Sequence, residues 1–526
     1  IRRLLSFSSL KKLSRSLKIS SVVTSFLHGK LRPNDQRVDS VKKPYMVVFH
    51  TRDLCLRILD TNSICTEMRN NMREELLKII GDESRVITDN IERKYLSDNL
   101  ERRIGSAGAV VFPVSTQEVS ELLKYAYTNQ IPVTPRGAGT NLVGSTVPHG
   151  DGIVIDVSLM NHILELDEET FTATVEPGVI LQDFQAFVES KGLFYPPDPG
   201  EKKASIGGNI STNAGGMRAV KYGVTRDYVI GLEVVLADGT VLTAGGKNRK
   251  DTTGLDLKEI VIGSEGTLAI ITKCVLKLIP KPEKSISILV GYESLKAGIE
   301  SVQKIIQANI NPTAIEFIER KVVQLGEDFL HLEFPLTDAK AYLLLTFDGK
   351  ESEITENIKT AEKVTRQAGA KAFLALEDPE VAANVWRIRG CLVKSVEAVS
   401  EQEPLDMVVP INQIDTFVNF INEYEKQCGM RMISFGHAGD GNVHLCVVRG
   451  DRDDATWAKE LDANLTVLYR KCTELGGLAS GEHGIGLSKQ KYMLEAANPA
   501  NIALMKRVKA AFDEKGILNP GISYDA

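Results

Sequence analysis

Short apolar runs and stretches of helical periodicity alternate along most of the chain. Residues 109–113 form an apolar run that ends at a proline, as in a buried strand. Residues 119–126 then have apolar positions at helical spacing, and Ser115 with Glu118 is typical of a helix start. A second apolar run, residues 131–134, follows. This order predicts a strand, a helix and another strand.

The alternation continues through both halves of the chain, and the Pro-Lys-Pro sequence at residues 280–282 is the expected boundary. The second half contains no dinucleotide motif, which suits substrate recognition. Its alternation indicates an antiparallel sheet backed by helices, of ferredoxin-like type. The expected strands are 153–157, 163–167, 172–175, 232–236, 286–292, 314–318 and 342–347, and the expected helices are 74–80, 181–191, 295–308 and 352–368. We therefore expect an α+β protein.

Three glycine-rich segments lie in the first half, at residues 135–144, 195–218 and 260–272. Glycine lets the backbone approach a charged ligand closely, and successive N–H groups of such a turn can bind phosphates. We expect the second segment to be irregular, and the third to be a buried strand that Gly263 and Gly266 interrupt. No G-x-G-x-x-G opens a helix and no Walker lysine follows. One segment alone could be a surface turn, but the three together predict one extended nucleotide.

Two of the eight histidines, His437 and His444, flank a glycine-rich turn. Two imidazoles brought together by a turn can share a metal ion. A third ligand could come from residues 480–486, in which Glu482 and His483 again lie among glycines. Each motif alone is also typical of structural histidines in turns, but the two together indicate a metal site. Imidazole and carboxylate ligands leave zinc, iron and manganese open.

The composition bears on which partners the protein can bind and on the cellular compartment in which it works. A formal net charge of −6 and a pI near 5.9 argue against a nucleic-acid surface, which usually has a basic excess. None of the seven cysteines forms a C-x-x-C pair, so no iron–sulfur or zinc-finger spacing is present. Dispersed cysteines indicate a reducing compartment, and no apolar run is long enough for a transmembrane helix. We expect a cytoplasmic location.

The first thirty residues contain seven lysines and arginines, many serines and no acidic residue. This composition is typical of an organellar transit peptide, which would place the protein in the mitochondrial matrix. A non-native upstream extension would look the same, because the sequence begins with Ile1 rather than methionine. Both alternatives stay open, and residues 1–67 are excluded from the expected fold.

The segments 135–144, 197–216 and 263–272 resemble the FAD-binding domain of the vanillyl-alcohol-oxidase-type flavoproteins. Within that family the chain is similar, from residue 70 to 524, to the D-lactate dehydrogenase and glycolate oxidase flavoprotein subunit branch. The resemblance implies an FAD-binding domain in two subdomains, then a substrate domain, then a C-terminal piece that returns to the flavin. Relatives with covalent flavin have a histidine at the position of Ala138, so non-covalent FAD is implied.

The resemblance also implies domain limits and contacts to FAD. The limits are 1–67 for the leader, 68–104 for an N-terminal helical segment, 105–283 for the FAD-binding domain, 284–500 for the substrate and metal-binding domain, and 501–526 for the C-terminal segment. The residues implied in FAD binding are Pro135, Arg136, Gly137, Ala138, Gly139, Thr140, Asn141, Gly144, Ser145, Pro199, Ser205, Gly208, Asn209, Thr212, Asn213, Gly215, Gly216, Glu265, Gly266, Ile270 and Asn519. For Asn519 an ordinary C-terminal turn is the alternative.

For the chemistry, the resemblance implies that His437, His444 and Glu482 bind a divalent metal and that His483 is the base. A 2-hydroxy acid can chelate such an ion through its hydroxyl and carboxylate oxygens, and the metal lowers the pKa of the hydroxyl. His483 would then take the proton while the hydride moves to flavin N5. Arg389, of the sequence Trp-Arg-Ile-Arg, is implied in binding the substrate carboxylate, with a surface salt bridge as the alternative.

Two departures from the family pattern bear on the substrate. The D-2-hydroxyglutarate branch has a lysine at the position of Pro404 and an asparagine at that of Cys446, so a second carboxylate would lack one expected cation. A small monocarboxylate is therefore implied, D-lactate before glycolate. Asp406 precedes an apolar run and is interpreted as structural.

The electrons that the flavin takes from the substrate must leave it again. The chain has no cysteine motif for an iron–sulfur cluster that could accept them. The resemblance implies a partner protein, either an electron-transfer flavoprotein, as for the D-lactate dehydrogenases the chain most resembles, or an iron–sulfur subunit. An oligomer is also expected. The alternative function is a non-catalytic flavin-binding subunit of an electron-transfer complex.

Overall fold

The computed structural model describes residues 45–48 and 57–525. The chain divides after Met72 into two compact units. In the first unit β1 (Tyr45–Val48) pairs antiparallel with β2 (Arg57–Asp60). The basic residues 1–30 of the expected leader lie outside the described residues. Helix α3 (Thr61–Ile80) starts earlier than the expected helix at 74–80, because its helical hydrogen bonding continues through a polar stretch.

The first half of the second unit contains two main sheets. A four-stranded sheet has the order β3–β4–β6–β5, in which β4, β6 and β5 are parallel. A five-stranded antiparallel sheet has the order β11–β10–β12–β8–β7. The strands of this half are β3 (Val86–Ile87), β4 (Ala109–Val111), β5 (Val133–Arg136), β6 (Ile153–Asp156), β7 (Ile163–Asp167), β8 (Thr172–Val175), β9 (Leu193–Phe194), β10 (Val229–Val235), β11 (Val241–Gly245), β12 (Ile270–Lys277) and β13 (Ile279–Pro280), and the helices are α4 (Thr116–Asn129), α5 (Leu181–Glu189), α6 (Ile206–Thr212), α7 (Ala219–Tyr222) and α8 (Leu257–Val261).

The predicted strand–helix–strand unit is present as β4, α4 and β5. Ser115 caps α4, and its hydroxyl accepts a hydrogen bond from the N–H of Glu118 at 3.2 Å. The apolar stripe of the helix is fully buried, as at Leu122 and Leu123. Strand β5 continues to Arg136, so the first glycine-rich loop begins at Gly137.

Two expectations about the glycine-rich segments are wrong. The second segment contains helix α6, because Ser205 caps it and Ile206 and Ile210 bury one face at helical spacing. The third segment begins with the end of α8 and turns before β12. Gly263 and Gly266 have φ values of +79° and +71°, which a strand cannot accommodate.

The second half is built on one seven-stranded antiparallel sheet of order β17–β14–β16–β15–β19–β20–β18. The first four strands have the arrangement of a ferredoxin-like unit, and β18–α13–β19–β20–α14 repeats most of it. The two units join where β15 pairs with β19. The elements are β14 (Lys284–Tyr292), α9 (Leu295–Gln307), β15 (Ala314–Glu319), α10 (Arg320–Leu330), β16 (Ala341–Gly349), α11 (Glu351–Gln367), β17 (Ala372–Ala375), α12 (Pro379–Glu397), β18 (Gln402–Val408), α13 (Ile414–Cys428), β19 (Met432–His437), β20 (Asn442–Val448), α14 (Asp454–Glu474), α15 (Gln490–Ala496) and α16 (Pro499–Phe512).

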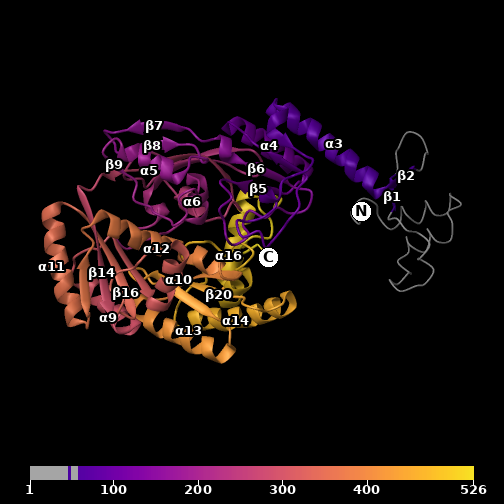
Figure 1. Ribbon diagram of the computed structural model, residues 1–526. Helices are drawn as coiled ribbons and strands as arrows, with labels where there is room; N and C mark the ends of the chain where they lie inside the picture. Colours follow the sequence, from indigo (N-terminus) through magenta and orange to yellow (C-terminus); the bar gives the residue numbers. More distant parts are fainter. Residues whose placement is uncertain (1–44, 49–56, 526) are drawn as a thin grey trace. The chain divides into compact units, whose positions relative to one another are not determined.

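Helices cover both faces of this sheet, as Figure 1 shows. Helices α9, α11, α13 and α14 pack on one face and share the larger apolar core with the strands. Helices α10 and α12 pack on the other face. The expected α+β class, with a ferredoxin-like antiparallel sheet in the second half, is therefore confirmed.

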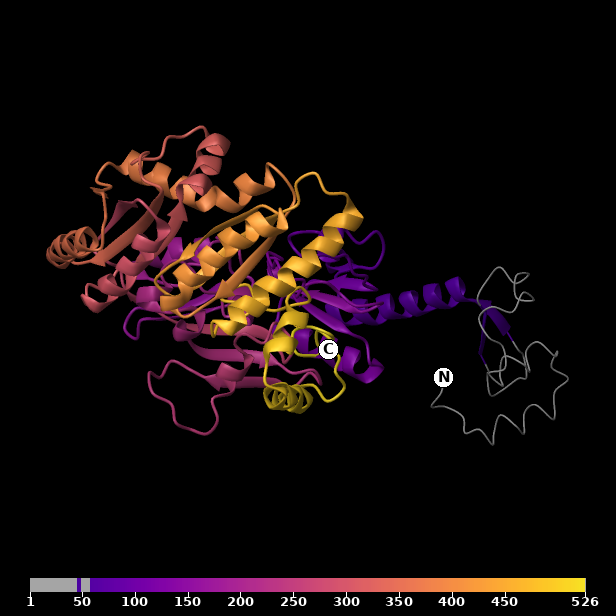
Figure 2. The same cartoon turned by 90° about the horizontal axis from the view of Figure 1, so that it is seen from below.

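The C-terminal segment returns to the first half, and its yellow ribbon lies against the violet strands in Figures 1 and 2. The N–H of Val133 donates to the carbonyl of Ile517 at 2.8 Å, and the N–H of Asn519 donates to the carbonyl of Val133 at 2.7 Å. The last residues thus extend the edge of β5, the strand that leads into the first glycine-rich loop.

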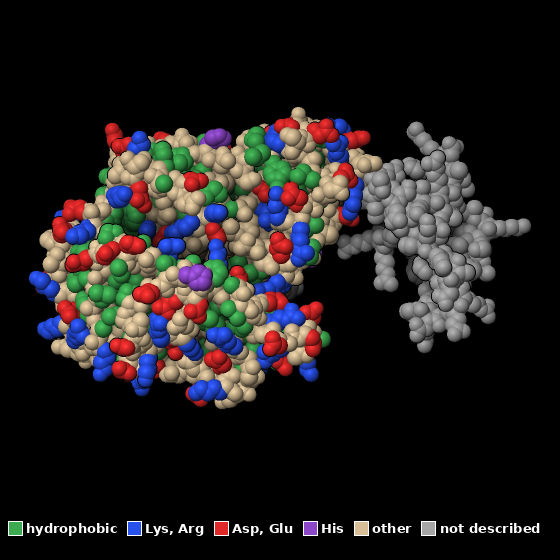
Figure 3. Space-filling model, viewed as in Figure 1, with side chains coloured by type: hydrophobic (Ala, Val, Ile, Leu, Met, Phe, Trp, Pro, Cys, Tyr) green, Lys and Arg blue, Asp and Glu red, His purple; other side chains and the backbone are tan. Residues whose placement is uncertain are grey.

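On the face seen in Figure 3, acidic and basic side chains are intermixed and form no continuous basic patch. In the part of the chain that the structure describes, no helix combines the length and apolar character that crossing a bilayer requires.

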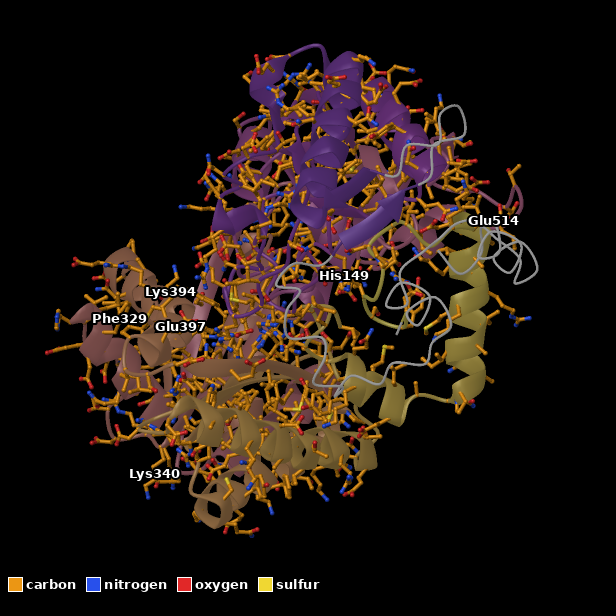
Figure 4. All side chains as sticks on the ribbon, turned by 90° about the vertical axis from the view of Figure 1, so that its right-hand side faces the viewer. His149, Phe329, Lys340, Lys394, Glu397 and Glu514 are labelled. Carbon is orange, nitrogen blue, oxygen red and sulfur yellow. The ribbon has the colours of Figure 1, made fainter. Side chains whose placement is uncertain are left out.

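We expect Phe317→Ala to lower the free energy of unfolding by about 3–5 kcal/mol, because the ring is completely buried where β15 joins β19. Chemical denaturation of the purified protein measures the change. Phe329→Ala is the matched control, since Phe329 is 42% exposed on α10 and lies on the surface in Figure 4. It should change stability by less than about 0.5 kcal/mol. Equal effects would contradict the assigned core.

Candidate functional site

The three glycine-rich segments lie against one another. A Cβ on Gly137 would lie 2.3 Å from Oγ of Ser205, and one on Gly266 would lie 3.0 Å from the ring of Pro135. The Ser205 hydroxyl also accepts a hydrogen bond from the N–H of Ala138 at 3.3 Å. Segments far apart in the sequence therefore form one surface, and their close approach requires glycine at Gly137.

This surface is one side of a cavity of about 760 Å³, within the size range of ligand sites. The other side comes from the seven-stranded sheet and α12, whose exposed Lys394 and Glu397 are labelled in Figure 4. The predicted FAD contacts that line the cavity are Pro135, Arg136, Gly137, Ala138, Gly139, Thr140, Asn141, Ser145, Pro199, Ser205, Gly208, Asn209, Thr212, Glu265, Gly266 and Ile270. Those that do not line it are Gly144, Asn213, Gly215, Gly216 and Asn519.

The cavity offers suitable surfaces for a flavin nucleotide. Among the described residues, the main-chain N–H groups of Gly139 and Thr140 find no hydrogen-bond acceptor. Unpaired N–H groups in a turn of this kind suit the oxygens of a phosphate. Apolar side chains such as Ala269 and Ile271 line the same cavity and can contact a ring system. The residues present therefore fit FAD.

Asn519 and Glu265, two predicted FAD contacts, are engaged by protein groups on other segments. Nδ2 of Asn519 donates to the carbonyls of Ser145 and Glu265, at 2.9 and 2.7 Å. The Glu265 carboxylate accepts hydrogen bonds from the Ser145 hydroxyl and from the N–H groups of Ile485 and Gly486. Burial raises the pKa of Glu265. These residues support the cavity wall and tie it to the loop that follows α14.

Strands β19 and β20 bring two imidazoles together. Their register pairs Phe435 with His444, which puts His437 and His444 on the same face of the sheet. The two Nε2 atoms are 3.2 Å apart, and Oε1 of Glu482 lies 3.3 Å from Nε2 of His437. Two ligands about 2.1 Å from one zinc ion lie roughly 3.2–3.4 Å apart in near-tetrahedral geometry. The three predicted ligands therefore fit one divalent ion.

Glu316 of β15, which the sequence analysis missed, holds this cluster from behind. The side chain is completely buried, and Oε1 accepts a hydrogen bond from Nδ1 of His437 at 2.6 Å. Outer carboxylates of this kind fix the tautomer and the orientation of a metal-binding histidine. A detectable signal was present in the sequence, because Glu316 interrupts the apolar positions of β15 at a place where the strand is buried on both sides of it.

Arg389 binds the same acid. Its Nε donates to Oε2 of Glu316 at 2.8 Å, and its guanidinium lies over the ring of Phe435. The side chain is only 9% exposed, so its ion pair with Glu316 is buried and the alternative of a surface salt bridge is wrong. Arg389 lines the cavity, and among the described residues its Nη1 has no hydrogen-bond acceptor. The neighbouring Arg387 is exposed and donates to Asn384.

The charges of the cluster shift the pKa values of its members. Burial alone would lower the pKa of His437, but Glu316 and Glu482 outweigh it and raise that pKa well above its usual value. Burial and the charge of His437 lower the pKa of His444 to about 3. Burial would raise the pKa of Glu482, but His437 brings it down to about 2. His444 and Glu482 are therefore in the forms that bind metals.

His483 lies beside the cluster. Its ring stacks on that of His444, with centroids 5.7 Å apart and planes 19° apart. Burial lowers the pKa of His483, which favours the neutral imidazole that can accept a proton. Its Nδ1 is buried without a hydrogen-bond partner in the described part of the chain, 4.0 Å from Oδ2 of Asp406. Asp406 lies within β18 rather than before a strand.

Two family profiles match the chain. The profile described as an FAD binding domain matches residues 107–245, and that described as FAD linked oxidases, C-terminal domain, matches residues 281–522. D-lactate dehydrogenase of Anaerostipes hadrus is 40% identical over 88% of this chain and 98% of its own length. Glycolate oxidase subunit GlcD of Bacillus subtilis (strain 168) is 39% identical over 86% and 96%. D-2-hydroxyglutarate dehydrogenase, mitochondrial, of Arabidopsis thaliana is 32% identical over 84% and 78%.

Solved structures share the fold. p-Cresol methylhydroxylase with substrate bound has a TM-score of 0.73 at 18% identity, over 86% of this chain and 96% of its own. 4-Ethylphenol oxidase from Gulosibacter chungangensis has a TM-score of 0.70 at 20% identity, over 87% and 97%. The predicted vanillyl-alcohol-oxidase-type architecture is thereby confirmed.

We expect His444→Ala to reduce bound divalent metal at least about tenfold, because it removes one of three converging ligand atoms. Metal content is measured by plasma mass spectrometry after dialysis against one equivalent each of zinc, iron and manganese. His149→Ala is the control, since His149 is exposed and is not among the residues that line the cavity. Full metal content in the His444 variant would rule out the ligand set.

Proposed function

The chain belongs to the family of FAD-linked oxidases that includes D-lactate dehydrogenases and glycolate oxidase subunits, and we propose that it oxidises a small D-2-hydroxy acid to the 2-oxo acid. D-lactate is the favoured substrate and glycolate the next. The observation that carries the proposal is one cavity that joins the three glycine-rich segments to His437, His444, Glu482 and His483. The surface proposed for the cofactor and the side chains proposed for metal binding and proton transfer thus line the same cavity.

FAD would be held by the glycine-rich segments, with phosphate oxygens on the free N–H groups of Gly139 and Thr140. When bound, FAD supplies the acceptor for a hydride. Ala138 has no side chain that could form a bond to the flavin, which supports non-covalent binding.

A divalent metal would be held by His437, His444 and Glu482, and zinc, iron and manganese all accept this ligand set. When bound, the metal supplies a Lewis acid that makes a coordinated hydroxyl more acidic. Glu316 keeps Nδ1 of His437 engaged, so Nε2 of that ring faces the cluster.

The remaining side chains would bind and deprotonate the substrate. His483 lies beside His444, and burial lowers its pKa, which favours the neutral ring that would take the hydroxyl proton. Arg389 would contact the substrate carboxylate through Nη1, because Nε and Nη2 already bind Glu316. The guanidinium is thereby fixed before the substrate arrives, which lowers the entropic cost of binding.

Two cavity residues support a monocarboxylate. Pro404 and Cys446 line the cavity and present no cation to a second carboxylate. Burial also raises the pKa of Cys446 to about 12, so the thiol adds no charge. Electrons would leave to a partner, for which an electron-transfer flavoprotein or an iron–sulfur subunit has suitable chemistry.

We expect D-lactate to bleach the flavin absorbance fully in an anaerobic titration, glycolate to do so more weakly, and L-lactate not at all. D-2-hydroxyglutarate should require a much higher concentration, because no second carboxylate contact is expected at Pro404. If none of the four acids reduced the flavin while dithionite did, the alternative of a non-catalytic flavin-binding subunit would be favoured.

We expect His483→Ala to retain FAD and metal but to slow flavin reduction by D-lactate at least about a hundredfold, because the variant lacks the base. Stopped-flow absorbance under anaerobic conditions measures the rate. The exposed His149→Ala variant should reduce at the wild-type rate. Normal reduction in the His483 variant would remove that residue from the mechanism.

A further inference from the structure

Glu482 and His483 lie on a connection without regular structure, between the end of α14 and the start of α15. A site of this kind needs its side chains held to within a fraction of an ångström. Loops do not provide that precision by themselves. Some other group must therefore fix the backbone at these two residues.

The carboxylate of Asp406 contacts this loop at three consecutive residues. Oδ2 accepts hydrogen bonds from the N–H groups of Gly481, Glu482 and His483, at 3.1, 2.9 and 2.9 Å. Asp406 lies in β18 and is completely buried. A single rigid oxygen in the sheet thus sets the path of the backbone that carries both side chains.

The same carboxylate also closes the loop at its two ends. The Ser480 hydroxyl donates to Oδ2 at 2.9 Å, and the ammonium of Lys489 donates to it at 3.2 Å. Lys489 is itself only 2% exposed and also donates to the Ser480 hydroxyl. The other oxygen, Oδ1, accepts from Nδ2 of Asn442 at 2.7 Å.

These contacts leave Asp406 little capacity to act as a metal ligand, although Asp406, His444 and His483 also converge. Both of its oxygens are already bound to protein donors. The short distance between the loop and Asp406 also explains why residue 481 is a glycine. A Cβ on Gly481 would lie 2.3 Å from Nδ2 of Asn442 and 3.1 Å from Oδ1 of Asp406. The backbone of the loop therefore packs directly against the Asp406 carboxylate.

We propose that Asp406 is a positioning residue, which places Glu482 toward His437 and His483 against His444 by binding the backbone between them. The inference rests on the proposed function for its kinetic readout, but its metal readout is independent. Lys489 balances the buried charge and is not needed to hold the three N–H groups.

Two double variants separate this role from simple ion-pair stability. Asp406→Asn with Lys489→Met and Asp406→Leu with Lys489→Met both remove the ion pair and fill its volume. Only the asparagine offers an oxygen to the three N–H groups. Each is prepared with FAD, its metal content is measured by plasma mass spectrometry, and its flavin reduction by D-lactate is followed anaerobically.

We expect the asparagine variant to keep its metal and to reduce within about tenfold of the wild-type rate, and the leucine variant to lose metal and to reduce at least about a hundredfold more slowly. Equal metal content and equal rates in the two would overturn the proposal. If D-lactate did not reduce the flavin of the wild-type protein, the proposed function would fail. The metal contents of the two variants would still test whether Asp406 positions the loop.

If the leucine variant did not fold, Lys489→Met alone would decide. It breaks the ion pair but leaves the acceptor oxygen in place, so metal content and a reduction rate within about tenfold of wild type should be retained. Loss of both in a folded, FAD-bound Lys489→Met protein would assign the effect to the ion pair and overturn the proposal.

Discussion

The need to neutralise buried carboxylates organises this molecule. Glu316 and Asp406 are completely buried and Glu265 nearly so. A carboxylate removed from water costs several kcal/mol unless charged or hydrogen-bonding groups replace its hydration. Each of these acids finds its partners on other elements. Glu316 binds α12 and β19, Asp406 binds the loop after α14, and Glu265 binds that same loop and Ser145, which follows the first glycine-rich segment. The requirement to satisfy each acid therefore assembles the site from segments that are far apart in the sequence.

The same requirement explains the glycines of residues 480–486. A Cβ on Gly484 would lie 2.9 Å from the carboxyl carbon of Glu265, and one on Gly486 would lie 2.2 Å from the carbonyl oxygen of Val143. Gly484 and Gly486 allow a close approach to groups of the first half, as Gly481 does to Asp406 of the second half. The loop is thus held between Asp406 of the sheet and Glu265 of the third glycine-rich segment. Its glycine content reflects packing rather than mobility.

The sequence predicted what local pattern determines. Hydrophobic periodicity predicted α4 and, in the second half, the elements β14, α9, β15, β16 and α11. Glycine spacing together with the family resemblance predicted many of the residues that line the cavity. Helix α6 was missed because two glycines and two hydroxyl residues obscure an apolar stripe of only Ile206 and Ile210. Glu316 and the role of Asp406 were missed for another reason. A buried acid between apolar residues shows that a partner must exist, but Arg389 lies 73 residues from Glu316 and His483 lies 77 residues from Asp406.

The charge balance of the cluster links metal and substrate. Glu316 and Glu482 flank His437, and together they raise its pKa well above the usual value. A proton and a divalent cation would therefore compete for Nε2 of His437, and a bound cation would be stabilised by the same two carboxylates that retain the proton. Because the Glu316 carboxylate already balances the charge of Arg389, the Arg389 guanidinium adds little net charge to the cavity. An anionic substrate would thus be attracted chiefly by the metal, while Arg389 would orient its carboxylate.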